Sequence, residues 1–425
     1  MILLLIILLF ALIIIRMPIA FSLMTVSIIG IGWTGIEFLE IIPRKMYFGI
    51  NNFSLLAVPL FVLAGEIMSK GGISERIVNF SKLLIGPLPG GLAMVVIISS
   101  VFFAALTGTA IAAAAAIGGM LLPLMKKEGY DEGFSSALVA SASTVGPIIP
   151  PSIIFILFGV MANQSISDLF IGGIVPGILM GVGLMIYSYF VGKKNNYKSM
   201  DSFPPVKDVL LGFKDAILAL LMPAIIIGGI ISGLFTATES GVIAVLYAIL
   251  ISTLVYKELT FKKLYDALIS STKTSVGIIF LIGSAAVFIW FVSFNNVPEQ
   301  IQNMLGIFAE NPLLLLLVIN IVLLIAGTFI DTISAVTIFT PIFLPLILAT
   351  NIDPIHFGVI MAVNLSIGMI TPPVGVCLFV VSSISKVDIK KIIKAIVPQL
   401  AILILILVII TYVPWLITYP VSLLK

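Results

Sequence analysis

The chain is a succession of apolar runs, each about 20 residues long, separated by short polar stretches. A helix of that length can cross the ~30 Å hydrocarbon core of a bilayer. One such run alone is equally consistent with a buried helix of a globular core. Many runs in succession along 425 residues indicate a membrane protein instead. The pattern therefore predicts an all-α polytopic fold.

In one region of the first half, the apolar pattern divides into two short arms around a polar tip. The arms are Gly90–Leu106 and Ala110–Met125, and the tip is Thr107-Gly108-Thr109. Each arm of about 16 residues reaches only ~24 Å, which is short of a full crossing. The arrangement predicts a re-entrant hairpin, and the alternative is one bent helix that spans the membrane.

The same arrangement occurs in the second half. Pro312–Ala326 and Ile333–Ala349 flank a polar tip at Gly327–Thr332. After each predicted hairpin comes an apolar segment interrupted by adjacent prolines, Pro150-Pro151 and Pro372-Pro373. Proline cannot donate a backbone hydrogen bond, so these segments predict helices that are broken at membrane depth. Such irregular backbone is tolerated where it lines a cavity or is buried in protein.

The two hairpin and break regions are related by a constant offset of 222 residues, with no gap. Repeated apolar segments interrupted by Gly and Pro in two halves of a chain are typical of transporters and point to their binding site. The matched residues are Leu122-Pro123-Leu124 with Leu344-Pro345-Leu346, Asp131 with Asp353, Gly146 with Gly368, and Pro150-Pro151 with Pro372-Pro373.

Lysines in the short connections predict the orientation of the spans, because cytoplasmic loops are rich in Lys and Arg. The loop after Leu124 is rich in lysine, whereas the matching loop after Leu346 has neither Lys nor Arg. The two halves are therefore predicted to be inverted repeats. The segments predicted to lie inside are Arg16 and connections 126–127, 193–198, 257–263 and 386–391. The segments predicted to lie outside are both termini and connections 163–168, 236–240 and 350–354.

These observations predict two repeats, 1–192 and 215–425, with a cytoplasmic linker at 193–214. Each repeat begins with scaffold helices and an amphipathic interfacial arm. The arms contain Ser69–Ile77 and Asn295–Ile301, for which an extramembrane loop is the alternative. The predicted segments are the scaffold 1–89, hairpin 90–125, broken helix 133–160 and further helix 169–192, then the scaffold 215–311, hairpin 312–349, broken helix 355–385 and last helix 395–424.

Composition excludes several functional classes. The chain is 60% hydrophobic and 10% charged, which is too little charge for a soluble domain of this length. Its net charge is +3, and its basic residues form no stripe that would bind nucleic acid. The only Gly-Lys pair, Gly192-Lys193, lies in no phosphate-binding loop. The chain has one histidine, His356, and one cysteine, Cys377, which argues against a metal site and excludes an internal disulfide. We therefore expect no enzyme and no cofactor, and we interpret Met1–Ile15 as a retained first helix.

Polar residues gather at the tips and breaks. A helix that ends in mid-membrane exposes free carbonyls at its C-terminus and free amides at its N-terminus. Carbonyl oxygens and Ser/Thr hydroxyls suit Na⁺, whereas amides suit a carboxylate. The alternative for any single Ser or Thr is close helix packing. The first predicted Na⁺ site comprises Ser99, Ser100, Thr107, Gly108, Thr109, Ser143, Gly146 and Pro147, with Ser141 and Thr144 nearby; the second comprises Gly327, Thr328, Asp331, Thr332, Gly368, Met369 and Thr371, with Ser366 nearby. The predicted substrate contacts are Thr109, Pro150, Ser152, Thr332, Asn364 and Pro372.

Asp331 is the most informative single residue of these sets. A carboxylate at membrane depth is costly and indicates function. The alternative is a cap for the helix that begins beside it, and both roles can hold at once. Glu66 is interpreted as an interfacial acid, since it stands close to the end of the apolar run Leu55–Met68.

These motifs resemble those of the large membrane subunit of tripartite ATP-independent periplasmic (TRAP) transporters. The resemblance implies an elevator-type transporter of the bacterial inner membrane, with Na⁺ as coupling ion. It implies uptake of an organic acid, with sialic acid preferred here over C4-dicarboxylates. It also implies two partners, a small four-helix membrane subunit on a separate chain and a periplasmic substrate-binding protein. The matching stretches are Val58–Gly65, Ala105–Gly119, Gly146–Ser152, Gly327–Thr332 with Pro341 and Pro345, and Asn364–Gly375.

Two other functions stay open at this point. The first is a standalone Na⁺/dicarboxylate symporter of the same superfamily. Such a protein typically carries Ser-Asn-Thr at both tips, and Thr107-Gly108-Thr109 in the first tip of this chain argues against it. The second is a channel or a membrane scaffold, and the paired hairpins and midplane breaks argue against it because neither protein needs them.

Overall fold

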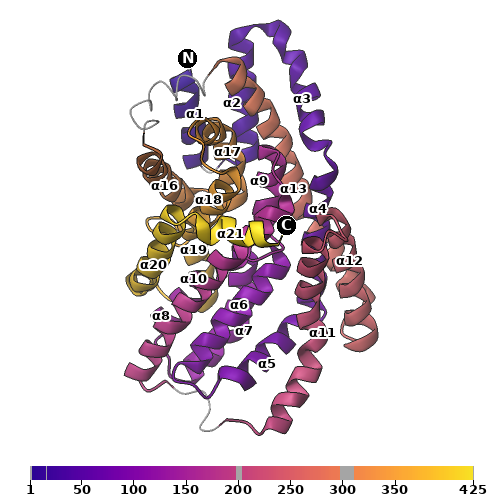
Figure 1. Cartoon of the computed structure of the whole chain (residues 1–425), viewed down its shortest axis with the longest axis vertical. Helices are drawn as coiled ribbons and strands as arrows, with labels where there is room; N and C mark the ends of the chain where they lie inside the picture. Colours follow the sequence, from indigo (N-terminus) through magenta and orange to yellow (C-terminus); the bar gives the residue numbers. More distant parts are fainter. Residues whose placement is uncertain (1, 16, 198–202, 297–310, 425) are drawn as a thin grey trace.

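The computed structural model describes residues 2–15, 17–197, 203–296 and 311–424, and the regular elements of these ranges are all helical (Figure 1). The first half contains α1 (Ile2–Ile14), α2 (Ile19–Thr34), η1 (Ile36–Glu40), α3 (Ile41–Ile50), η2 (Phe53–Leu56), α4 (Ala57–Lys70), α5 (Ile73–Ile85), α6 (Gly91–Thr107), α7 (Ala110–Lys127), α8 (Glu132–Ser143), η3 (Gly146–Ile148), α9 (Ile153–Ala162) and α10 (Ile166–Lys194).

The second half repeats much of this order. It contains α11 (Val206–Ile231), α12 (Ala237–Leu250), the π-helical turn η4 (Ile251–Val255), α13 (Phe261–Phe294), α16 (Pro312–Phe329), α17 (Thr332–Ala349), α18 (Pro354–Gly368), α19 (Val376–Ser385), α20 (Ile389–Tyr412) and α21 (Trp415–Leu423).

Nine helices in the described ranges are long and apolar enough to cross a membrane. The number is up to ten if the bent pair of α8 with η3 and α9, which turns by 42°, counts as one span. The prediction of an all-α polytopic membrane fold is confirmed.

Both predicted pairs of arms are present as helices, joined by tips of two residues. Gly108-Thr109 joins α6 to α7, and Ile330-Asp331 joins α16 to α17. Both tips are shorter than predicted, because α6 continues to Thr107, α16 continues to Phe329 and α17 begins at Thr332. We call these pairs hairpin 1 and hairpin 2. Helix α8 packs against both arms of hairpin 1, and α18 packs against both arms of hairpin 2. Hairpin 1 lies in the lower half of Figure 1 and hairpin 2 in the upper half.

The repeat is visible in the helix boundaries. Helix α7 runs from Ala110 to Lys127, and α17 runs from Thr332 to Ala349, so both ends obey the offset of 222 residues. The two halves also interlock, because α7 packs against α19 of the second half and α17 packs against α9 of the first. The two hairpins and the two broken helices therefore form one body.

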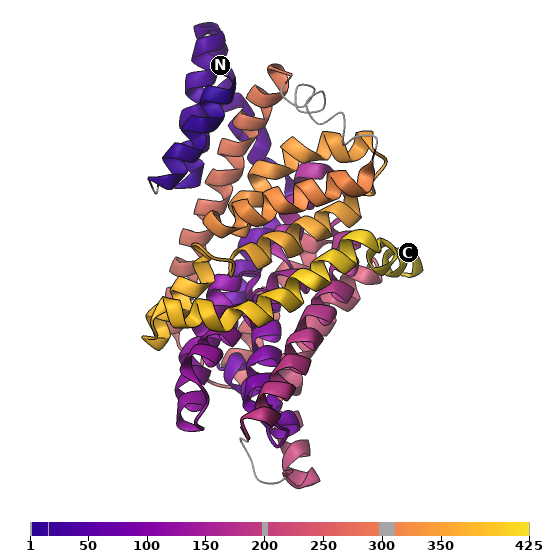
Figure 2. The same cartoon turned by 90° about the vertical axis from the view of Figure 1, so that its left-hand side faces the viewer.

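A second group of helices forms a frame beside this body. The long helix α13 packs against α2, α3 and α4, while α12 packs against α4 and α11 packs against α5. In Figure 2 the steep helices of the frame contrast with the more level α16, α18 and α20. The cavity beside hairpin 1, described below, lies between the frame and the interlocked body.

The first predicted interfacial arm is helix α5, set off from α4 by Gly71 and Gly72. Arg76 fixes this arm: Nη1 lies 2.7 Å from Glu258 Oε1, and the guanidinium lies 3.7 Å from the ring centre of Tyr256. Burial by itself lowers the pKa of Arg76, but Glu258 and Asp215 outweigh it and raise that pKa. Beyond Asn296, the second predicted arm lies outside the described residues, as does Lys198 of the linker.

Two predicted boundaries differ from the structure. The single last helix at 395–424 is two helices, α20 and α21, because Val413 precedes Pro414 and adopts a non-helical backbone with φ −121° and ψ 73°. The end of the predicted linker is helical, since α11 begins at Val206.

Candidate functional site

The tip of hairpin 1 lies against the start of α9. Gly108 has φ +67°, and a Cβ at this position would come within 2.8 Å of the Ile153 side chain. Only glycine meets both conditions without strain. Thr109 then caps α7, its hydroxyl accepting a hydrogen bond from Ala112 N at 3.4 Å. The first tip and the first break are therefore neighbours, as the sequence predicts.

The hydroxyl groups of Ser141, Ser143 and Thr144, at the end of α8 before this break, donate to carbonyls of the preceding turn. Ser143 Oγ donates to the Val139 carbonyl at 2.6 Å, and Thr144 Oγ1 donates to the Ser141 carbonyl at 2.7 Å. The Ser141 hydroxyl also donates to Gln399 Oε1 on α20. Gly146 and Pro147 form the buried turn η3. This side of the cluster offers backbone groups more readily than free hydroxyls.

Hydroxyl groups on α6, the facing arm of hairpin 1, behave differently. The oxygens of Ser99, Ser100 and Thr107 are buried and have no hydrogen-bond partner. A buried hydroxyl without a partner costs about 1–3 kcal/mol, so these three groups are available to a ligand. Neutral oxygens of this kind suit a hard cation with few formal charges around it.

The second tip and the second break touch through their backbones. A Cβ on Gly368 would lie 2.6 Å from Gly327 Cα, so this position has no room for a side chain, and a Cβ on Gly327 would have little room at 3.1 Å from Gly368 Cα. Gly375 N donates to the Thr328 carbonyl at 3.0 Å, and Cys377 N donates to the Met369 carbonyl at 3.0 Å. Thr371 Oγ1 donates to the carbonyl of Ile367 at 2.8 Å.

Asp331 caps α17 with both of its carboxylate oxygens. Oδ1 accepts from Ser334 N at 3.1 Å, and Oδ2 accepts from Ser334 Oγ at 2.6 Å. The capping role that the sequence allows is therefore present. The carboxylate is only partly exposed, and the neighbouring Thr332 is buried. A charged role toward a cation stays a prediction.

The sequence analysis missed an amide network around the predicted substrate contact Asn364. Nδ2 of Asn364 donates to Asn320 Oδ1 at 2.6 Å and to the Asn320 carbonyl at 2.9 Å. Asn320 in turn donates to Thr411 Oγ1 at 3.1 Å. Asn364 Oδ1 remains buried without a partner. A polar signal existed, because Asn320 is the only amide in the apolar run of α16, and such residues are costly in membranes.

The six predicted substrate contacts differ in burial and in whether they line a cavity. Thr109 alone lines one of the cavities described below. Pro150, Thr332 and Asn364 are buried, and Pro372 is partly exposed. Ser152 is buried and its hydroxyl is used inside the break, where it donates to the Pro147 carbonyl and accepts from Phe155 N.

A cavity of about 450 Å³ separates hairpin 1 from the frame. Glu66 and Ser69 of α4 and Thr274 of α13 line one side, and Thr107 and Thr109 line the other. Glu66 accepts a hydrogen bond from Ser270 at 2.9 Å and pairs with Lys70 at 3.3 Å, so both of its carboxylate oxygens have a partner.

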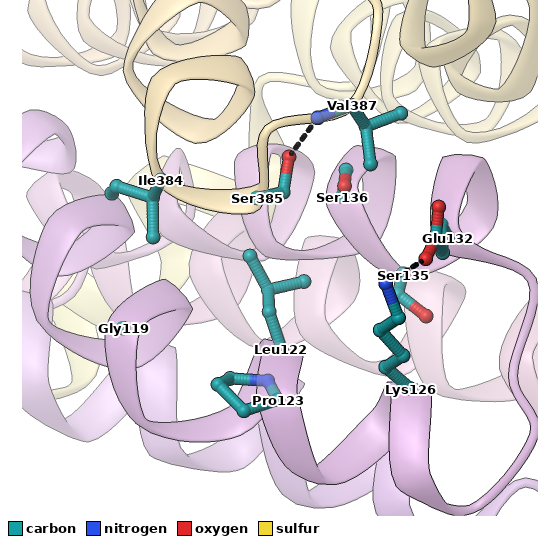
Figure 3. Close-up of a pocket in the computed structure, with 10 residues that line it drawn as sticks. All are labelled: Gly119, Leu122, Pro123, Lys126, Glu132, Ser135, Ser136, Ile384, Ser385 and Val387. Carbon is teal, nitrogen blue, oxygen red and sulfur yellow. Dashed lines mark hydrogen bonds and ion pairs between the residues drawn. The ribbon is translucent and has the colours of Figure 1, made fainter.

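A smaller pocket of about 240 Å³ lies among α7, α8 and the end of α19 (Figure 3). The Lys126–Glu132 ion pair, at 2.6 Å, stands at one side of it, and the Ser136 hydroxyl is buried there without a partner. Residues of both halves line this pocket, which reflects their interlocking.

Within the described residues, no three His, Cys, Asp or Glu side chains gather as a metal site. The available donors are hydroxyls, an amide oxygen and the carbonyls of broken helices. This set suits Na⁺ rather than a transition metal.

Comparison with known proteins gives the family. Residues 6–416 match the family model of the tripartite ATP-independent periplasmic transporter, DctM component. An isethionate TRAP transporter permease protein of Oleidesulfovibrio alaskensis is 40% identical, and the match covers 94% of this chain and 63% of that protein. The sialic acid TRAP transporter large permease protein of Vibrio cholerae is 37% identical, over 94% of this chain and 93% of that protein.

A solved structure supports the fold. The YdaH transporter of Alcanivorax borkumensis has a TM-score of 0.66 with 14% sequence identity, covering 91% of this chain and 90% of that chain. At that identity the likeness concerns the fold alone. The family match and the permease relatives confirm the resemblance found in the sequence: the chain belongs to the DctM-component family of tripartite ATP-independent periplasmic transporters.

Proposed function

We propose that this chain carries an organic acid into the cell, driven by a Na⁺ gradient and without ATP. The observation that carries the proposal is the pairing of each hairpin tip with one broken helix. On α6, the arm that leads to the first tip, the buried hydroxyls of Ser99, Ser100 and Thr107 have no hydrogen-bond partner among the described residues. Cation ligands of this kind, built on half-helix ends at a repeat interface, are typical of secondary transporters.

The movement proposed is of the elevator type, in which the interlocked body moves against the frame. The cross-packing of α7 with α19 and of α17 with α9 supports a body that moves as a unit. The wall that hairpin 1 turns toward α4 contains Ala112, Ala115 and Ala116. Short side chains of this kind favour sliding, since they do not interdigitate deeply with a neighbouring helix.

The proposed partners are a small four-helix membrane subunit and a periplasmic substrate-binding protein, and the proposed location is the bacterial inner membrane. The two relatives are named for different substrates, isethionate in one and sialic acid in the other. Both are organic acids. Sialic acid is our first candidate for this chain, and C4-dicarboxylates are the second.

The test uses the chain with its small subunit in proteoliposomes and a candidate binding protein outside. We expect labelled organic acid to accumulate when an inward Na⁺ gradient is imposed with no nucleotide present. Uptake driven by a proton gradient alone, or only with internal ATP, contradicts the proposal. Uptake that is equally fast without any binding protein favours the standalone symporter.

A further inference from the structure

The two hairpins face cavities of opposite character. Beside hairpin 1, the cavity of about 450 Å³ contains Glu66, Ser69 and Thr274 from the frame. Beside the tip of hairpin 2, another cavity of about 450 Å³ is lined entirely by apolar residues, among them Phe10 and Phe329. An organic anion in the second cavity would lose its hydration with no polar partner in return. The polar side of hairpin 1 is therefore the route along which an anion can leave.

The polar cavity continues toward the lysine-rich end of the molecule. A further cavity of about 400 Å³ shares Ser69, Phe103 and Ala116 with it and adds Lys70 and Lys263. We call the two cavities together the vestibule. It leads from the tip of hairpin 1 to the end where the lysine-rich connections lie, which is the side predicted to be cytoplasmic.

The charges of the vestibule come from the frame, whereas the hairpin wall contributes small or apolar side chains. Lys70 Nζ lies 3.3 Å from Glu66 Oε2, and both side chains are 30% exposed. Glu66 Oε1 is held separately by the Ser270 hydroxyl at 2.9 Å. Lys70 can therefore turn to another anion on its flexible stem while Glu66 keeps a partner.

The other charged groups of the vestibule leave its second lysine available. Glu258 is occupied by Arg76 at 2.7 Å. Lys263 lines the vestibule and forms no ion pair within the described part of the chain, and Glu75 lines it as well. Three carboxylates and two lysines line the vestibule, and Arg76 neutralises Glu258 from beside it, so acids and bases are balanced and an anion can bind here without being trapped. A substrate passes through such a site only if its binding is favourable enough for it to enter and weak enough for it to leave.

We propose that Lys70 and Lys263 form a transient binding subsite for the acidic group of the substrate on its way out of hairpin 1. The subsite rests on the proposed function and adds to it a place on the static frame that selects for negative charge. It predicts an effect confined to one face of the membrane, because the vestibule reaches Lys263 in the connection 257–263, on the side predicted to be cytoplasmic.

The test compares Lys70→Gln and Lys263→Gln in right-side-out and inside-out membrane vesicles that contain the chain with its small subunit, with the binding protein supplied at the periplasmic face of both. The substrate concentration for half-maximal exchange is measured from each face with the labelled organic acid. We expect it to rise about two- to fivefold at the vestibule face, the size of one exposed ion pair, and to stay unchanged at the opposite face. High salt should reduce the difference, because it screens exposed charges.

Two further variants make the result decisive. Lys262→Gln removes an exposed neighbouring charge that lies outside the vestibule, and it should behave like the wild type. Lys70→Arg keeps the charge and should restore the wild-type value. Equal shifts at both faces, or a shift in Lys262→Gln, overturn the subsite. Absence of Na⁺-driven exchange in the wild type overturns the proposed function instead.

Discussion

At the scale of single residues, the two hairpin tips use the same position differently. Thr109 and Asp331 are matched by the offset of 222 residues, and each caps the helix that follows it. Thr109 caps with a neutral hydroxyl, whereas Asp331 caps with a carboxylate. A cap needs only an oxygen that accepts a hydrogen bond, and asparagine serves nearly as well as aspartate. The negative charge of Asp331 is therefore more than capping requires.

We predict that Asp331→Asn impairs Na⁺-driven uptake while the protein stays folded and assembled with its small subunit. The amide oxygen can still accept from Ser334 N, and the Ser334 hydroxyl can reverse its hydrogen bond and accept from the amide nitrogen, so the variant keeps the cap and removes the charge. Loss of that charge should weaken Na⁺ binding by about 1–3 kcal/mol, the scale of a charged hydrogen-bond partner. The Na⁺ concentration for half-maximal uptake should rise roughly ten- to hundredfold.

A matched control is available in the same half of the chain. Asp353 caps α18, where its Oδ1 accepts from Ile355 N at 2.7 Å and from His356 N at 3.2 Å. It lies at the opposite end of α18 from the break, so Asp353→Asn should leave the Na⁺ dependence unchanged. Unaltered Na⁺ dependence in Asp331→Asn would mean that the carboxylate is a helix cap only.

At the scale of elements, the second site depends on close contact between two helix ends. Helices α16 and α18 meet at Gly327 and Gly368, where a single added methyl group has no room. The Asn320–Asn364 pair joins the same two helices further from the tip. The contact brings the carbonyls of α18 toward the tip of hairpin 2, so helix packing decides the geometry of this cluster.

We predict that Gly368→Ala destabilises the protein by about 1–3 kcal/mol, as overpacking of a close contact does. The obstructing atoms belong to the backbone of Gly327 and cannot rotate away. Na⁺-driven uptake should fall more than the amount of folded protein does. Thermal unfolding in detergent and uptake in proteoliposomes measure the two effects.

Gly277→Ala on α13 is the control for this substitution. A Cβ at Gly277 meets no atom within 4 Å, so alanine should keep or raise stability by up to about 1 kcal/mol through its helix propensity. Wild-type stability and uptake in Gly368→Ala would show that α16 can separate from α18 without loss.

At the scale of the whole molecule, each hairpin packs against the broken helix of the other half, so the two halves contribute equivalent contacts to the body. Hairpin 1 packs on the second broken helix through α7 and α19, and hairpin 2 packs on the first through α17 and α9. Together with the lysine distribution, this arrangement favours repeats of opposite orientation in the membrane.

We predict that the loops around residues 126–132 and 350–354 lie on opposite faces of the membrane. Lys127→Cys and Thr350→Cys, each in a Cys377→Ala background, should react with an impermeant thiol reagent from opposite sides. The single native cysteine is buried in α19, so the background should label weakly even before its removal. Labelling of both positions from the same side of intact cells would refute inverted repeats.

The sequence by itself determined the spans, the repeat and the places where helices end. These features depend on local properties: the length of an apolar run, the missing amide of proline at Pro150-Pro151 and Pro372-Pro373, and the capping groups at Thr109 and Asp331. Each acts on the backbone within a few residues of its own position. The pattern of residues along the chain was therefore sufficient to predict them.

Only the tertiary structure decided which polar groups are free. Ser143 belongs to the same predicted Na⁺ site as Ser99, and Ser152 is a predicted substrate contact. The hydroxyls of Ser143 and Ser152 are used inside the first broken helix, whereas that of Ser99 has no partner among the described residues. The partner of Asn364 is Asn320, on another helix, and the polar character of the cavity beside hairpin 1 depends on Glu66 of α4. A buried polar group is paired or left unpaired by the helices packed around it, and residues distant in sequence supply those neighbours.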